Sequence, residues 1–183
     1  MGNKAVFIDR DGTINVNVGY LDNPDDFQMY PGVAEGIKLL QENGFKIIII
    51  TNQSGIARGY FTVETLKRIH ERMLKEFYDK GVTIDAIYYC PHHPDEGCGC
   101  RKPNTDLFEK AVKEHNIDIT RSYVIGDRML DIEAGHRMGL KTVLVPEKKE
   151  KVEKEMKKSK IKPDYLCNDF YSGVKWILKN NKS

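Results

Sequence analysis

The chain has 183 residues, of which 40% are hydrophobic and 31% are charged, and its formal net charge is +2. This composition is typical of one globular domain with a real apolar core, so we expect a single domain over residues 1–183. The small net charge argues against nucleic acid or an acidic membrane as a partner, and no apolar run is long enough to span a bilayer. Because the sequence shows no signal peptide, we expect a cytoplasmic location. We also expect a monomer.

Short β-branched runs alternate with amphipathic stretches, which is the pattern of βαβ units. The predicted strands cover residues 5–9, 46–50, 84–89, 123–125 and 142–145, with a short sixth strand at 165–167. The predicted helices cover residues 33–43, 63–80, 106–115, 130–138 and 170–179. The expected fold is α/β, a three-layer, doubly wound, mostly parallel sheet. No gap between these elements is long enough for a large cap domain.

Capping residues and glycines mark the ends of several predicted helices. The expected caps are Thr62, Thr105 and Asp169, and the expected stops are Gly44, Gly81 and Gly139. The lysine-rich run at residues 147–162 is predicted to be a solvated helix rather than a nucleic-acid surface. Its expected i,i+4 ion pairs are Glu147–Lys151, Glu150–Lys154 and Glu153–Lys157.

Four segments place polar side chains next to predicted strand ends or helix starts. They are Asp9 and Asp11 before Gly12-Thr13, Thr51 after residues 46–50, Lys102 in an expected extended stretch before Pro103, and Asp127 and Asp131 after residues 123–125. Each segment alone is compatible with ordinary turn or capping chemistry. Together, at the carboxyl edge of a parallel sheet where ligands bind, they indicate one site. For Asp131 we favour an orienting role over direct ligation or helix capping.

Hydrolysis of a phosphate monoester needs neutralised oxygens, an aligned nucleophile and a proton for the leaving alkoxide. With Mg²⁺ on Asp9, Asp127 and the backbone carbonyl of Asp11, the Asp9 carboxylate can attack phosphorus. Asp11 is then expected to act as acid and base, with its protonated form favoured by neighbouring carboxylates. Thr51 and Lys102 are expected to hold the transferring oxygens.

The motifs Asp9-x-Asp11-Gly12-Thr13, Thr51, Lys102 and Gly126-Asp127-x-x-x-Asp131 resemble those of the haloacid dehalogenase-like phosphohydrolases. The resemblance spans residues 4 to 145 and implies a Mg²⁺-dependent phosphatase acting on a small sugar bisphosphate. The residues that it places near the sugar or its second phosphate are Asn17, Val18, Gly19, Tyr20, Asn52, Gln53, Ser54, Arg101 and Arg128. Arg58 is a further cationic candidate.

Two other functions fit parts of the same sequence. One is a phosphatase of histidinol phosphate or of a nucleic-acid 3′-phosphate on the same scaffold. The short segment between His92 and Cys98 resembles that of histidinol-phosphate phosphatases. The other is a non-catalytic zinc-containing interaction module. The intact set of Asp9, Asp11, Thr51, Lys102 and Asp127 argues against that module, since a binding module does not need both Asp9 and Asp11.

Residues 90–100 hold three cysteines and two histidines. Thiolates with an imidazole favour Zn²⁺ in a closed tetrahedral site, which points to a structural metal. The spacing alone does not choose between His92 and His93. By resemblance to the related phosphatases, the zinc ligands are Cys90, His92, Cys98 and Cys100, and the metal would fix the loop that delivers Arg101 and Lys102.

Overall fold

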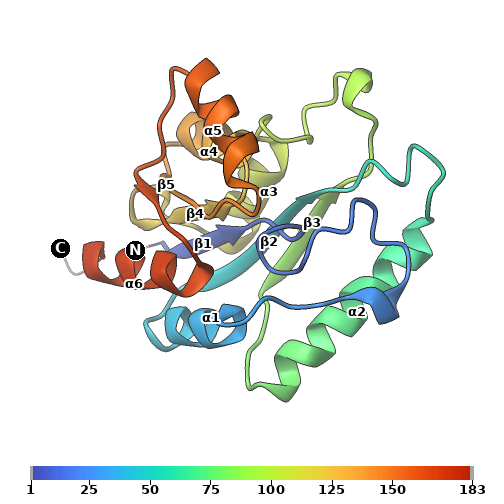
Figure 1. Ribbon diagram of the computed structural model, residues 1–183. Coiled ribbons are helices and arrows are strands. Elements are labelled where there is room, and N and C mark those ends of the chain that lie inside the picture. Colours follow the sequence, from blue (N-terminus) through green and yellow to red (C-terminus); the bar gives the residue numbers. More distant parts are fainter. Residues whose placement is uncertain (1, 182–183) are drawn as a thin grey trace.

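The strand β1 (Ala5–Ile8) lies inside a sheet of six parallel strands in the computed structural model, which describes residues 2–181 (Figure 1). The other strands are β2 (Lys46–Asn52), β3 (Ala86–Cys90), β4 (Tyr123–Gly126), β5 (Lys141–Leu144) and β6 (Tyr165–Leu166). Their order across the sheet is β3-β2-β1-β4-β5-β6, with every neighbouring pair parallel. The strand order therefore reverses between β1 and β4, which is where ligands bind in open α/β sheets.

Helices cover both faces of this sheet (Figure 1). They are α1 (Val33–Glu42), α2 (Val63–Asp79), α3 (Asp106–His115), α4 (Met129–Met138), α5 (Lys149–Lys158) and α6 (Phe170–Asn180). Three one-turn 3₁₀ helices, Pro24–Asp26, Pro94–Glu96 and Ile119–Arg121, lie in the connections. Helices α1, α2 and α6 share one core with the sheet, and α3 and α4 share a second core on the opposite face. The predicted three-layer α/β architecture is confirmed.

The two cores follow from the alternation of side chains along each strand. Val6 and Ile8 face the α1, α2 and α6 layer, whereas Ala5 and Phe7 face α3 and α4. All four side chains are at most 1% exposed. The Phe7 ring lies 5.2 Å from the ring of Phe108 in α3. Burial on both faces explains why the strand reads as one continuous apolar run.

Several predicted boundaries differ from the structure. Strand β2 continues through Asn52, because Thr51 and Asn52 pair with β3. The caps Thr62 and Asp169 are confirmed by side-chain hydrogen bonds, and the three glycine stops all have positive φ. Thr105 occupies the predicted N-cap position of α3 but makes no side-chain capping hydrogen bond, since its hydroxyl donates to the Glu109 carboxylate at 2.8 Å instead.

The lysine-rich segment forms a shorter helix than predicted, α5, which begins at Lys149. None of the three expected glutamate–lysine pairs forms within the described chain. Glu147 instead accepts hydrogen bonds from Tyr30 Oη (2.6 Å) and the Asn17 N–H (2.9 Å). Val152 is buried in a small core with α4 and β5, so one face of α5 is packed rather than solvated.

The carboxyl edge of the sheet is roofed by loops alone in the part of the chain that the structure describes. The connections after β1, β2 and β3 contain no element longer than one helical turn before α1, α2 and α3 begin. The expected absence of a large cap domain therefore holds for residues 2–181. Among these residues, no helix combines the length and apolar character that a membrane crossing requires.

Candidate active site and metal cluster

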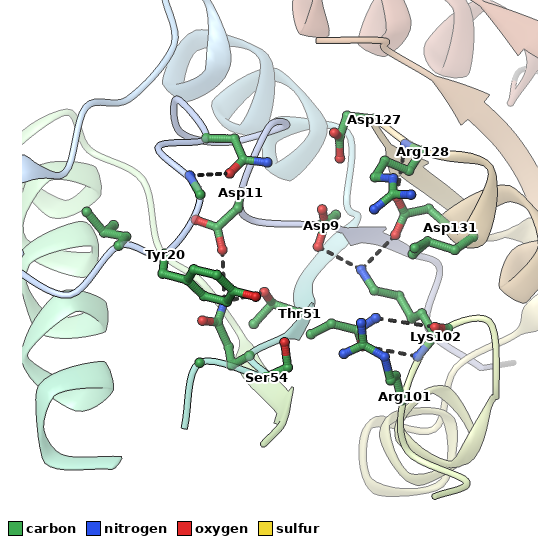
Figure 2. Close-up of a pocket in the computed structure, with 17 residues that line it drawn as sticks. Asp9, Asp11, Tyr20, Thr51, Ser54, Arg101, Lys102, Asp127, Arg128 and Asp131 are labelled. Carbon is green, nitrogen blue, oxygen red and sulfur yellow. Dashed lines mark hydrogen bonds and ion pairs between the residues drawn. The ribbon is translucent and has the colours of Figure 1, made fainter. Parts of the chain in front are cut away.

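The carboxyl ends of β1, β2 and β4 meet at a cleft of about 210 Å³ (Figure 2). Strand pairing explains the meeting, because the Asp9 N–H continues the β1–β4 ladder by donating to the Ile125 carbonyl at 3.0 Å. The predicted catalytic residues that line the cleft are Asp9, Asp11, Thr51, Lys102, Asp127 and Asp131. The structure thus brings together segments that span more than 120 positions of the chain.

Lys102 is the cation at the centre of this cleft, and its side chain is nearly buried. Its Nζ lies 2.7 Å from Asp9 Oδ1 and 2.7 Å from the Ile50 carbonyl oxygen, to which it donates hydrogen bonds. An ion pair of 2.7 Å joins the same Nζ to Asp131 Oδ1 (Figure 2). Burial acts to lower the pKa of Lys102, but Asp131 and Asp9 outweigh it and hold the pKa above its ordinary value. Lys102 is therefore a fixed positive charge beside Asp9.

Asp9, Asp127 and Asp131 each offer a carboxylate oxygen, and these atoms all lie within 4.8 Å of one another. Burial, followed by the charges of Asp9 and Asp131, raises the pKa of Asp127 to about 9. Burial also raises the pKa of Asp131 to about 6, against the opposing effect of Lys102. Three crowded carboxylates facing one lysine form a donor set that suits a hard divalent cation such as Mg²⁺.

Glycine at position 12 makes room for this cluster. Gly12 has a φ of +88°, and a Cβ built there would lie 2.5 Å from Asp127 Oδ2. Any other residue would be strained in this backbone conformation and would displace the Asp127 carboxylate. Thr13 Oγ1 donates to the other oxygen, Asp127 Oδ1, at 3.4 Å.

Asp11 faces a different environment from the one that the sequence predicted. Arg10 Nη2 donates to both Asp11 oxygens, at 2.9 and 2.8 Å, and the side-chain amides of Asn15 and Gln53 donate at 3.0 and 2.9 Å. Burial acts to raise the pKa of Asp11, but Arg10 and these amides outweigh it and hold the pKa below its ordinary value. The expectation that neighbouring carboxylates favour protonated Asp11 is therefore wrong for this arrangement.

Arg10 and His70 are functional neighbours that sequence reasoning missed. The Arg10 side chain is fully buried, and its Nη1 lies 3.1 Å from His70 Nε2 in α2. Burial and the Arg10 guanidinium lower the pKa of His70 to about 3, against a smaller effect of Asp11. The imidazole is thus neutral and accepts from Arg10. The sequence alone does not reveal this contact, because it joins residues 60 positions apart.

Two predicted substrate residues, Asn52 and Arg128, line the cleft and also make contacts with other parts of the protein. Asn52 lines the cleft, but its Oδ1 accepts from the Lys102 N–H at 3.0 Å and its Nδ2 donates to the Lys102 carbonyl at 3.3 Å. The segment that contains Lys102 is a turn, because the Asn104 N–H donates to the Arg101 carbonyl at 2.8 Å. The prediction of an extended stretch there is wrong. Arg128 also lines the cleft and pairs with Glu155 of α5 at 2.7 Å.

The remaining substrate candidates divide into two groups. Those that line the cleft are Asn17, Gly19, Tyr20, Gln53, Ser54 and Arg101. Val18 and Arg58 are not part of the lining, and Val18 is 56% exposed. Arg101 Nη1 and Arg128 Nε are buried without a hydrogen-bond partner among the described residues, so both arginines have donors to spare for an anion.

The cysteine loop forms a second, separate cluster. The sulfur atoms of Cys90, Cys98 and Cys100 lie 3.0 to 3.5 Å apart. His92 Nδ1 lies 3.6 Å from Cys90 Sγ and 3.1 Å from Cys100 Sγ. A tetrahedral zinc site needs ligand separations of roughly 3.5 Å, so the four donors fit that ion closely. His93 points elsewhere, because its Nδ1 accepts from the Asp95 N–H at 3.3 Å.

A parallel sheet with paired aspartates after β1 and an acidic cluster after β4 defines the haloacid dehalogenase-like hydrolases. The HAD-hydrolase-like family model matches residues 99–172. The chain is 41% identical to a D-glycero-β-D-manno-heptose-1,7-bisphosphate 7-phosphatase of Haemophilus ducreyi, over 97% of this chain and 100% of the relative. It belongs to the D-glycero-D-manno-heptose-1,7-bisphosphate 7-phosphatase family.

A second relative and one solved structure agree with this assignment. A probable heptose-bisphosphate phosphatase of Thermoplasma volcanium is 46% identical over 75% of this chain and 94% of its own length. The crystal structure of D,D-heptose 1,7-bisphosphate phosphatase from B. bronchiseptica, complexed with magnesium and phosphate, has a TM-score of 0.86. It is 30% identical and covers 97% of this chain and 99% of that one.

Proposed function

We propose that this protein removes the 7-phosphate of D-glycero-D-manno-heptose 1,7-bisphosphate in a Mg²⁺-dependent reaction. The observation that carries the proposal is the meeting of Asp9, Lys102 and Asp127 in one cleft with two arginines that have unused donors. The heptose substrate is that of the named relatives. A cleft that holds the Asp9 carboxylate as a nucleophile and Arg101 and Arg128 as cations is consistent with a substrate that carries two phosphates.

In the first step, a carboxylate oxygen of Asp9 attacks phosphorus while the bond from phosphorus to the sugar oxygen breaks. Lys102 and the Thr51 hydroxyl hold the phosphoryl oxygens during the transfer. Asp9, Asp127 and the backbone carbonyl of Asp11 are the groups that would hold Mg²⁺, which when bound neutralises charge on the phosphoryl oxygens. Asp131 keeps Lys102 in place through its ion pair of 2.7 Å.

Asp11 handles the protons in both steps. As a carboxylate it takes a proton from the water that hydrolyses the aspartyl-phosphate, and the Arg10 contact favours this form. As an acid it gives a proton to the leaving sugar oxygen. A protonated carboxyl loses most of its attraction to Arg10, so this form is free to turn from the guanidinium toward the cleft.

The second phosphate of the substrate is assigned to Arg101 and Arg128, with Ser54 and the segment Asn17–Tyr20 on the sugar. Bidentate contacts from arginine to a phosphate are strong and directional. A monophosphate would leave these donors unused. Discrimination should therefore arise from the loops alone, since the described residues contain no cap domain.

We also propose that Cys90, His92, Cys98 and Cys100 bind one structural Zn²⁺. The four donors leave no position open for a substrate or water, which is typical of structural rather than catalytic zinc. The remaining parts of the proposal are one domain over residues 1–183, a cytoplasmic location and a monomeric state.

Side-by-side phosphate-release kinetics test the substrate. With Mg²⁺, kcat/KM should be at least about tenfold higher for the heptose bisphosphate, in either anomer, than for histidinol phosphate. Arg128→Met should reduce this preference, whereas Arg58→Met should not, because Arg58 lies outside the cleft lining. A preference for histidinol phosphate in the unmodified protein would refute the proposal.

A further inference from the structure

Two exposed tyrosines from different loops meet at the rim of the catalytic cleft. Tyr20 belongs to the loop after β1 and lines the cleft, where its ring reaches across from the side of Asp11 (Figure 2). Tyr60 belongs to the loop after β2. The two ring centroids lie 4.6 Å apart at an interplanar angle of 63°, an edge-to-face contact. The Tyr20 and Tyr60 side chains are 43% and 54% exposed, so this contact lies at the surface.

Tyr60 is held firmly by its own loop. The Tyr60 N–H donates to the Gly55 carbonyl at 2.9 Å, and the Arg58 N–H donates to the Ser54 carbonyl at 3.0 Å. The next side chain, Phe61, is buried against Gly55, where an added Cβ would lie 2.2 Å from the Phe61 ring. Because Phe61 anchors the turn, the backbone of Tyr60 is held in place beside Tyr20.

The segment that carries Tyr20 is anchored at its ends, by the Asn17 N–H, which donates to Glu147 Oε1 at 2.9 Å, and by the buried side chain of Leu21, but between these points it makes few backbone hydrogen bonds. Gly19 has a φ of +92°, with nothing within 4 Å of an added Cβ, and its N–H donates to Asn17 Oδ1 at 2.9 Å. Val18, two positions before Tyr20, is 56% exposed. The contact with Tyr60 therefore restricts a ring whose own backbone supplies few contacts.

The two sides of the cleft have different chemistry. The floor is polar and charged, and Tyr20 is the one aromatic side chain among the described residues that line the cleft. An aromatic face packs well against the C–H groups of a carbon chain, whereas hydroxyls and phosphates need the polar floor. The arrangement thus suits a phosphorylated polyol whose carbon chain lies under the Tyr20 ring.

We propose that Tyr60 is a positioning residue for substrate specificity, because it sets the orientation in which Tyr20 covers the carbon chain of a sugar phosphate. The inference rests on the proposed function, since it takes a sugar phosphate as the substrate. It adds Tyr60 to the residues that determine specificity, although Tyr60 contacts Tyr20 and not the substrate. Removing the Tyr60 ring weakens binding of the carbon chain and leaves the phosphoryl chemistry on the floor intact.

The test compares Tyr60→Ala, Tyr60→Phe and the matched control Tyr78→Ala, whose tyrosine is 75% exposed in α2 and is not part of the cleft lining. The measured quantities are KM and kcat for heptose 1,7-bisphosphate and for fructose 1,6-bisphosphate, and the inhibition constant of inorganic phosphate. Tyr60→Ala should raise KM for the preferred sugar about threefold to tenfold, as expected for the loss of one aromatic pair. Its kcat and its inhibition constant for phosphate should stay within about twofold.

The controls separate a positioning role from damage to the site. Tyr60→Phe keeps the ring and should behave like the unmodified protein, and so should Tyr78→Ala. An unchanged KM in Tyr60→Ala, an equal loss of phosphate affinity, or a loss in Tyr60→Phe as large as in Tyr60→Ala would each overturn the inference. If the unmodified protein turns over fructose 1,6-bisphosphate but not the heptose, the proposed function fails, and the Tyr60 comparison is decided on the fructose substrate.

Discussion

Asp9 is the proposed nucleophile, and the fold depends little on its side chain. Its carboxylate accepts from Lys102, but Lys102 keeps two other partners, the Ile50 carbonyl and Asp131. The side chain of Asp9 is also the least buried of the three clustered aspartates. Changing its oxygen to an amide nitrogen should therefore disturb the chemistry much more than the fold.

We expect Asp9→Asn to reduce Mg²⁺-dependent phosphate release by at least about a thousandfold, because an amide is a poor nucleophile. Phosphate-release assays check the rate, and thermal unfolding checks that the melting temperature stays within a few degrees. Turnover near that of the unmodified protein would exclude Asp9 as the nucleophile.

His70 makes the stability of the protein depend on pH. Its pKa in the folded state, about 3, lies below the ordinary value, so between pH 3 and 6.5 the unfolded chain binds a proton that the folded chain does not. The stabilisation is complete above the unfolded pKa and is lost as pH falls toward the folded one. Acidification from neutral pH should therefore cost the unmodified protein a few kcal/mol of unfolding free energy.

His70→Gln, which keeps an acceptor for Arg10 but cannot titrate, should lose less unfolding free energy than the unmodified protein over this pH range. His136→Gln, at an exposed histidine of α4, is the matched control. Urea unfolding at several pH values measures the difference. Parallel curves for the His70 variant and the unmodified protein would contradict a neutral, buried His70.

At the scale of elements, the loop from β3 to α3 connects the cysteine cluster to Lys102. Cys100 is two positions before Lys102, whose backbone is pinned by Asn52. The loop holds only one-turn helical structure, so its shape depends on side-chain contacts rather than on a long ladder of backbone hydrogen bonds. A metal bound by the cysteine cluster would thus help to fix the position of Lys102 without contacting it.

Protein prepared without added metal should contain about one zinc per chain, and Cys98→Ala should lose both the zinc and several degrees of thermal stability. Activity should fall as well, because the loop no longer holds Lys102. Cys167→Ala, at a buried cysteine outside the cluster, should keep its zinc. Elemental analysis and thermal unfolding measure these effects, and a fully active, zinc-free preparation would refute a structural metal.

At the scale of the whole molecule, the sheet and the site were predictable to different degrees. Strands buried on both faces read as apolar runs, and polar residues at their carboxyl ends meet wherever the strands are parallel, so Asp9, Thr51 and Asp127 could be placed together. The Arg10–His70 contact could not, because it depends on how α2 packs beneath the loop after β1. The same is true of Glu155, whose partner Arg128 lies across a helix–helix contact.

Metal binding should stabilise the entire fold, because the acidic cluster draws on β1, β4 and α4 at once. Without metal, burial and then the charges of Asp9 and Asp131 hold the pKa of Asp127 at about 9, so at neutral pH this group is mostly protonated. Mg²⁺ binds the carboxylate and must displace that proton. Its affinity should therefore rise as pH increases toward 9.

Saturating Mg²⁺ should raise the melting temperature by roughly 5–10 °C, the effect of about 2–3 kcal/mol of binding free energy on a domain of this size. The increment should be larger near pH 8.5 than near pH 6.5 because less proton is displaced. Asp127→Asn should remove the increment at both pH values while zinc is retained, whereas Asp22→Asn, at an exposed aspartate, should leave it unchanged. Thermal scans with and without Mg²⁺ decide the matter, since an increment that survives Asp127→Asn would place the cation elsewhere.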